Sequence, residues 1–158
     1  MSLDFADFIV PAAVIPDLAA VDKTSALEEM VKGFMHAGVI AREHLSGVIS
    51  ALFARERIAP TAIGNGIAVP HAKHPGIGRL SGLVARSREG IEFGAENGEL
   101  SRVFFMILSG TQDHGRHLEA LARVSRAGRD SLFTRCLMGA RDSQGILTYL
   151  EKYDEERS

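Results

Sequence analysis

The chain has 158 residues, of which 46% are hydrophobic and 24% are charged, as is typical of one globular domain of ordinary size. Its 18 basic residues stand against 20 acidic ones, so the net charge of −2 provides no overall basic surface for a nucleic acid. The single cysteine excludes an internal disulfide, and the fold is therefore not expected to need an oxidising compartment.

The N-terminus lacks the features of a secretory signal, because its first seven residues carry two aspartates and no lysine or arginine. The longest apolar run, residues 103–108, is too short to cross a membrane. We therefore expect one domain over residues 1–158, located in the cytoplasm and without direct membrane insertion.

The first third of the chain predicts an extended arm followed by two helices. Residues 3–20 are apolar but interrupted by prolines, which favours a short strand or an extended arm. Two apolar stripes with helical spacing follow, and Gly38 is expected to end the first helix. The stripes are Leu27, Met30, Val31, Phe34 and Met35, then Leu45, Val48, Ile49, Leu52 and Phe53. Candidate N-caps of the first helix are Asp22, Thr24, and Ser25 in a capping box with Glu28.

The middle of the chain predicts strands separated by loops. Residues 67–69 form a candidate strand within a stretch rich in proline and glycine. Residues 80–86 and 91–93 predict short strands around a turn at 89–90. The apolar run 103–108 is typical of a central strand that is covered on both faces.

The last third of the chain predicts helices. Asp113 is a candidate N-cap for the first of them. The expected core stripes are Leu118, Leu121, Ala122 and Ser125, then Leu132, Phe133, Cys136 and Leu137, then Ile146, Leu147 and Leu150. Cys136 would then be a buried structural thiol. Helices, then strands, then helices indicate an α/β fold: a single-domain sandwich whose mixed, roughly five-stranded sheet is flanked by helices.

Residues 55–75 are the candidate active-site segment. Pro70 directly precedes His71 and fixes the backbone just before the imidazole. The nearby Gly64 and Gly66 let backbone N–H groups approach a ligand and can form an anion-binding concavity. An imidazole titrates near neutrality, so it can be a neutral nucleophile or a general base at pH 7. These features indicate a histidine that works beside a phosphate group.

The same segment resembles the active-site signature of the type 2 enzyme IIA domains of the bacterial phosphoenolpyruvate-dependent phosphotransferase system, in the fructose, mannitol and nitrogen-regulatory group. The matching residues are Arg55-Glu56, Thr61, Gly64-Asn65-Gly66, Ile67-Ala68 and Pro70-His71. More loosely, residues 90–95 resemble the family's hairpin after the active site, and residues 117–122 resemble the start of a helix that carries a second histidine. The chain departs from the family at Ser109-Gly110, where a proline is common.

The resemblance implies a phosphotransferase that carries a phosphoryl group on a histidine and uses no cofactor. His71 occupies the family's phosphorylated position, which receives the group from an HPr-type phosphocarrier protein and passes it to an enzyme IIB component. His117 occupies the position of the second histidine, which helps to hold the phosphoryl group, and Arg55 matches a family arginine near the site. The loop residues expected to support the phosphate are Thr61, Gly64, Asn65 and Gly66.

Two alternatives remain open at this point. In the nitrogen-regulatory branch of the family, the phosphorylation state controls binding to a regulatory target protein, and this chain could act in that way. Two H-x-x-H pairs, His71 with His74 and His114 with His117, suggest a metal-binding protein instead. Prolines on both sides of the first pair argue against a helix there, so we expect no metal site.

Two protein partners would have to dock over His71 in turn, so we expect an apolar rim around this residue. The candidates for such a rim are Ile63, Ile67 and Val69.

Overall fold

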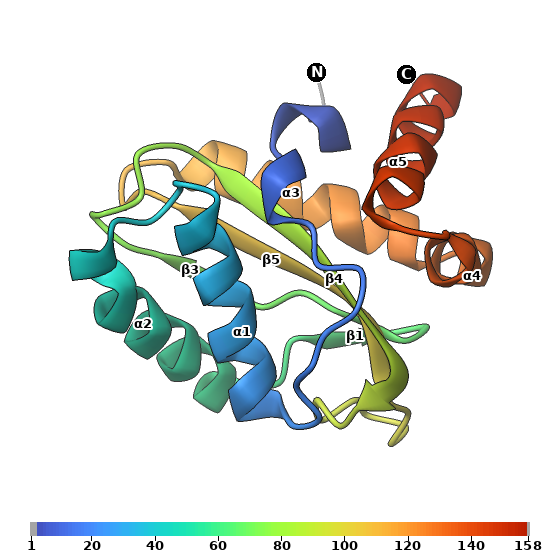
Figure 1. Ribbon diagram of the computed structural model, residues 1–158, viewed down its shortest axis with the longest axis horizontal. Helices are drawn as coiled ribbons and strands as arrows, with labels where there is room; N and C mark the ends of the chain where they lie inside the picture. The colour runs from blue at the N-terminus through green and yellow to red at the C-terminus, as the bar shows by residue number, and fades with distance from the viewer. Residues whose placement is uncertain (1–2, 158) are drawn as a thin grey trace.

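The computed structural model describes residues 3–157 of the chain. It is an α/β sandwich in which a five-stranded mixed sheet lies between two layers of helices (Figure 1), so the predicted fold class is confirmed. One layer consists of α1 (Lys23–His36) and α2 (Leu45–Ile58), where α2 is preceded by the 3-10 turn η3 (Arg42–His44). The other consists of α3 (His114–Gly128), α4 (Ser131–Gly139) and α5 (Ser143–Arg157).

The sheet is built around β5 (Ser101–Ser109). β4 (Ser81–Ile91) pairs with it antiparallel along one side. β2 (Ile67–Ala68) and β3 (His71–Lys73) pair with it parallel and in the same register, so they form one interrupted strand on its other side. β1 (Ala62–Gly64) pairs antiparallel with β2.

The side chains of residues 103–108 in β5 alternate between the two helical layers and are fully buried. The side chains packed with α1 and α2 are Phe104, Met106 and Leu108. Those packed with α3, α4 and α5 are Val103, Phe105 and Ile107. The predicted central strand, covered on both faces, is therefore confirmed.

The predicted turn at residues 89–90 is wrong, because β4 continues through these residues to Ile91. Gly90 has φ +86°, and the pairing register shifts between Arg86 and Ile91. A Cβ at Gly90 would lie 2.7 Å from the Cβ of Leu100, so the close approach of the residue just before β5 also requires glycine. A glycine with positive φ serves a bulge as well as a turn, and the sequence does not distinguish the two.

The N-cap of the first helix is not the serine of the predicted capping box. α1 starts at Lys23, and the Asp22 side chain accepts a hydrogen bond from the backbone N–H of Ser25 at 2.9 Å. Asp22 is thus the N-cap, and Ser25 lies in the first turn. Gly38, with φ +82°, follows the end of the helix as predicted.

The predicted core stripe of α3 is wrong. Leu118 is 64% exposed, and the buried face instead carries His117, Ala120, Val124 and Ala127. Most side chains on this buried face are small or polar, and the polar ones find partners only in the tertiary structure. A prediction from hydrophobicity alone therefore chooses the neighbouring face. In α4, Phe133 and Leu137 are buried as predicted. By contrast, Leu132 is 49% exposed and Cys136 is only partly buried.

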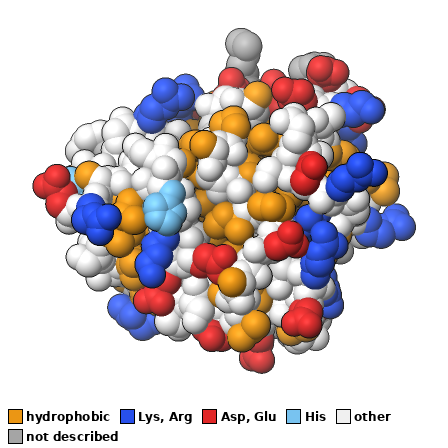
Figure 2. Space-filling view, in the orientation of Figure 1, with side chains coloured by type: hydrophobic (Ala, Val, Ile, Leu, Met, Phe, Trp, Pro, Cys, Tyr) orange, Lys and Arg blue, Asp and Glu red, His pale blue; other side chains and the backbone are white. Residues whose placement is uncertain are grey.

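The N-terminal arm runs along β4 as an extra extended segment, as predicted. It contains two 3-10 turns, η1 (Phe5–Asp7) and η2 (Pro11–Ala13), and isolated bridges join Ile9 and Ile15 to β4. On the face that carries the arm and α1, hydrophobic side chains gather in the middle, and acidic and basic ones are mixed around the rim (Figure 2). Within residues 3–157, no helix is both long and apolar enough to cross a membrane.

Candidate active site

Two histidines from different elements meet at one edge of the sheet. His71 lies on β3, and because the side chain of Ala72 packs into the α1–α2 layer, that of His71 points to the opposite face, where α3 lies. His117 lies near the start of α3, and its backbone N–H donates to the Asp113 carbonyl. The two rings are 5.6 Å apart between centroids, with 60° between their planes.

Hydrogen bonds select the tautomer of His71. Nδ1 lies 2.8 Å from the carbonyl oxygen of Val69, which can only accept, so Nδ1 carries the ring proton. Nε2 accepts from the Nε–H of Arg55 at 3.2 Å. The lone pair of Nε2 is therefore the nucleophilic electron pair of this imidazole.

A serine fixes the ring of His117. Ser109, the last residue of β5, places its Oγ 2.6 Å from Nδ1 of His117, and both side chains are buried. This contact leaves Nε2 of His117 available. Ser109 stands where the family commonly has a proline, and no sequence signal marks it as a partner of a residue eight positions later.

Burial is the main cause of the lowered pKa values of both histidines. It lowers the pKa of His71, with smaller contributions in the same direction from Arg55 and Lys73, and hydrogen bonding to Val69 opposes the change. Burial, followed by repulsion from His71 and Lys73, lowers the pKa of His117 to about 4. Both imidazoles are therefore neutral at pH 7, and the Nε2 lone pair of His71 is not lost to a proton.

α2 supplies the arginine of the site. Besides its bond to His71, Arg55 donates from Nη1 to the carbonyl of Ala59 at 2.8 Å. This second bond fixes the guanidinium near the end of the helix. The structure thus brings together the three predicted catalytic residues, His71, His117 and Arg55.

A buried carboxylate connects α2 to the strand of His71. Glu56 accepts hydrogen bonds from the N–H and the hydroxyl of Thr61, and it forms an ion pair with Lys23 at 2.6 Å. The Thr61 carbonyl in turn accepts from the N–H of Val69 at 3.0 Å, and Val69 holds Nδ1 of His71. Thr61 thus acts on the site through the backbone.

The sequence does contain a signal that Glu56 is buried, although the motif match draws attention to it only as the neighbour of Arg55. Val48, Leu52 and Glu56 are spaced by four residues and lie on the same buried stripe of α2. A carboxylate on an apolar helix face needs a partner.

The glycine-rich turn lies away from His71. The carbonyl of Gly66 accepts from Arg102 and Val103 on β5, whereas His71 pairs with Ile107. His71 lies five positions after Gly66 along this extended segment, which corresponds to about 16 Å. The expectation that the amides of Gly64, Asn65 and Gly66 support a phosphate on His71 does not fit this placement.

The same turn instead holds the far end of α3. Asn65 has φ +53°, and its Nδ2 donates to the carbonyl of Gly128 at 2.8 Å. Thr134 of α4 donates to the carbonyl of Asn65 at 2.7 Å. The positive φ values of Gly64, Asn65 and Gly66 shape a turn that fixes the two helices.

The H-x-x-H pairs do not assemble into one cluster. The ring of His74 contacts that of His44, with centroids 5.6 Å apart, and Nδ1 of His114 lies at hydrogen-bond distance from Nζ of Lys73. Over residues 3–157, no three or more His, Cys, Asp or Glu side chains are grouped so that they could hold a metal ion. The metal alternative therefore has no ligand set in the part of the chain that the structure describes.

The predicted apolar rim is wrong at two of its three positions. Ile67 and Val69 are buried, and only Ile63 is exposed, at 43%. Apolar surface closer to the site comes from Leu118, which follows His117, and from Ile58, which is 80% exposed one turn after Arg55.

Comparison with known proteins identifies the class to which this site belongs. The family model described as "Phosphoenolpyruvate-dependent sugar phosphotransferase system, EIIA 2" matches residues 7–153, so the chain belongs to this family. It is a phosphotransferase component that acts through a phosphohistidine, in agreement with the neutral imidazole pair at the sheet edge.

Among its relatives is a "Nitrogen regulatory protein" of Bradyrhizobium diazoefficiens, 33% identical over 91% of this chain and 92% of that protein. The crystal structure of nitrogen regulatory protein IIA-Ntr from Neisseria meningitidis superposes with a TM-score of 0.82 and 25% identity, over 92% of this chain and 98% of that one. The mannitol enzyme IIA of Escherichia coli, in its complex with phosphorylated enzyme IIB, has the same fold, with a TM-score of 0.74 and 19% identity, over 89% and 95% of the two chains.

Proposed function

We propose that residues 1–158 act as one phosphocarrier unit, which accepts a phosphoryl group on Nε2 of His71 from a phosphorylated HPr-type protein. One observation carries the proposal. Nδ1 of His71 is protonated and bound to Val69, so the free lone pair of a neutral ring lies at Nε2, beside His117 and Arg55.

The transfer needs no proton donor or acceptor at His71. The Nε2 lone pair forms a bond to phosphorus while the N–P bond of the donor breaks, and its electron pair stays with the donor nitrogen. The proton on Nδ1 remains there, bound to the Val69 carbonyl. When the phosphoryl group later leaves for an acceptor, the N–P electron pair returns to Nε2, and the ring regains the same neutral tautomer.

The neighbouring groups supply positioning and charge. Arg55 donates to Nε2 in the free protein and becomes the counter-ion of the phosphoryl oxygens once Nε2 is occupied. His117 is held by Ser109 and offers its Nε2 side to the same oxygens. It also lies in the first turn of α3, where the helix dipole favours an anion.

The acceptor that we propose is an enzyme IIB component, as in the Escherichia coli mannitol complex. The exposed Leu118 and Ile58 provide apolar contact area next to the site for protein partners that dock in turn. Because the phosphoryl chain starts from phosphoenolpyruvate, we place the protein in the cytoplasm.

The direct test is phosphoryl transfer from phosphoenolpyruvate through enzyme I and an HPr-type protein of the same organism. The wild type should acquire an acid-labile, base-stable phosphate, His71→Ala should acquire none, and His117→Ala should be labelled about a hundredfold more slowly. The matched control is His36→Ala, on the exposed end of α1, which should be labelled like the wild type. An unlabelled wild type, or labelled His71→Ala, would contradict the proposal.

A regulatory role is the second candidate, and the similarity to the Bradyrhizobium nitrogen regulatory protein favours it. The same phosphorylated His71 would then control binding to a target protein. Deletion of the gene distinguishes the two roles: failure to grow on one sugar supports transport, whereas unchanged uptake with altered regulation supports signalling.

A further inference from the structure

A lysine lies at the junction where the two histidines meet. On β3, His71 and Lys73 are two residues apart and so point to the same face. On α3, His114 and His117 are one turn apart and so share a side of the helix. The ammonium of Lys73 donates to Nδ1 of His114, which closes a second contact between the strand and the helix beside the His71–His117 pair.

We propose that Lys73, positioned by His114, is a second cation that stabilises the phosphoryl group on His71. This inference rests on the proposed function of His71 and adds two residues to its site. The H-x-x-H motif at His114 and His117 then has a role that involves no metal.

The charge balance of the phosphorylated site favours a further cationic side chain beside His71. A phosphoryl group carries roughly two negative charges near neutral pH. The His71 ring keeps its Nδ1 proton when Nε2 bonds to phosphorus, so the ring then carries one positive charge, whereas neutral His117 offers hydrogen bonds only. Arg55 supplies one full positive charge, and Asp113 at the start of α3 adds a negative one, since its charge acts on His117. Lys73 offsets that negative charge.

The field of Lys73 reaches both rings. Its positive charge contributes to the lowered pKa of His71 and to that of His117. A cation that disfavours a proton on these rings favours an anion at the same place. Lys73 is also partly buried, which reduces the screening of its charge by water.

His114 acts on the lysine and not on the phosphoryl group. A lysine side chain has a long flexible stem and only donors at its end, so it holds one position only where an acceptor binds it. Nδ1 of His114 provides that acceptor, because the ammonium of Lys73 can only donate. His114 is therefore a positioning residue.

The test compares four variants of the full chain with the wild type in the transfer assay from a phosphorylated HPr-type protein. Lys73→Met should lower the equilibrium constant for phosphoryl transfer about tenfold and speed hydrolysis of the phosphohistidine, whereas Lys73→Arg should restore both. His114→Ala should give a smaller loss, about threefold. Lys152→Met makes the same change on the exposed face of α5 and should behave like the wild type.

A second measurement does not depend on phosphorylation. NMR titration of the His71 ring should give a higher pKa in Lys73→Met than in the wild type, and an unchanged pKa in Lys73→Arg and Lys152→Met. Equal transfer constants and equal pKa values in the wild type and Lys73→Met would overturn the inference. So would failure of Lys73→Arg to restore transfer, because a purely structural role predicts that result. An unlabelled wild type would instead overturn the proposed function of His71.

Discussion

A single proton on Nδ1 of His71 determines what this site can do. The Val69 carbonyl holds that proton, so the reactive lone pair lies at Nε2, where Arg55 already donates. A tautomer with the proton on Nε2 would lose both bonds. The site therefore reaches its reactive form without any proton transfer.

The buried histidines predict a loss of stability in mild acid. In the unfolded chain both rings have an ordinary pKa near 6.5, whereas in the folded protein the pKa of His117 is about 4 and that of His71 is lowered. Between these values the unfolded state binds more protons, so the free energy of unfolding falls as the pH drops from about 6.5 toward 4. Urea unfolding at about pH 7.5 and about pH 5 should show this decrease.

Replacing His117 should flatten that dependence. His117→Gln has no ring to protonate, so its free energy of unfolding should fall less between the two pH values than that of the wild type. His36→Gln, on the exposed end of α1, should keep the wild-type slope. An unchanged slope in His117→Gln would contradict the assignment of the effect to this ring.

At the scale of elements, α2 and the strand of His71 are held together by one carboxylate. Glu56→Gln removes the ion pair with Lys23 and weakens the two hydrogen bonds from Thr61. Because Lys23 is 30% exposed and can regain water, we expect a loss of about 1–3 kcal/mol in the free energy of unfolding. The measurement is urea unfolding at constant pH.

The matched control for this change is Glu28→Gln, because Glu28 is exposed on α1. It should alter the free energy of unfolding by less than about 0.5 kcal/mol. Glu56→Gln should also slow labelling of His71, because Thr61 positions Val69. Normal stability together with normal labelling would show that the network does not support the site.

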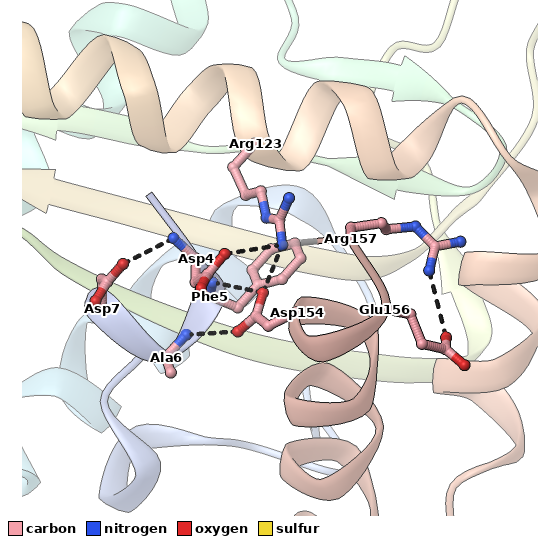
Figure 3. Close-up of polar contacts among 8 residues, drawn as sticks. All are labelled: Asp4, Phe5, Ala6, Asp7, Arg123, Asp154, Glu156 and Arg157. Atoms are coloured by element: carbon pink, nitrogen blue, oxygen red, sulfur yellow. Dashed lines mark hydrogen bonds and ion pairs between the residues drawn. The ribbon is translucent and has the colours of Figure 1, made fainter. Parts of the chain in front are cut away.

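At the scale of the whole molecule, α3 is tied at both ends, and between them it is linked to the two termini. Arg123 of α3 forms a buried ion pair with Asp154 of α5 at 2.6 Å (Figure 3). Asp154 also accepts the backbone N–H groups of Phe5 and Ala6, each at 3.0 Å. One carboxylate thus joins the N-terminal arm, the helix of His117 and the C-terminal helix.

Asp154→Asn should therefore loosen the arm and lower global stability. It leaves the buried guanidinium of Arg123 without a full counter-charge, and we expect a loss of about 2–4 kcal/mol in the free energy of unfolding. Hydrogen exchange should become faster along residues 5–18. Glu156→Gln, which breaks only an exposed pair with Arg157, should change the free energy of unfolding by less than about 0.5 kcal/mol. Equal losses in the two variants would contradict a special role for Asp154.

The sequence by itself determined the parts of this protein that depend on local pattern. The run 103–108 is apolar at every position, which is typical of a strand covered on both faces, and the structure buries all of it. The family motif around His71 marked Arg55 and His71 through residues close in sequence, and the looser match at 117–122 added His117. All three lie together in the structure.

The tertiary structure decided what depends on partners far along the chain. Gly64-Asn65-Gly66 lies close to His71 in sequence, yet the extended strand carries it about 16 Å away, where it holds the end of α3. By local sequence rules, Gly90 is expected in a turn and Leu118 in the core. Packing instead places Gly90 within β4 and Leu118 on the surface. The tautomer of His71 and the contacts of Ser109, Glu56 and Lys73 exist only because strands and helices bring their partners together. A hydrogen bond depends on distance in space and not on separation in sequence.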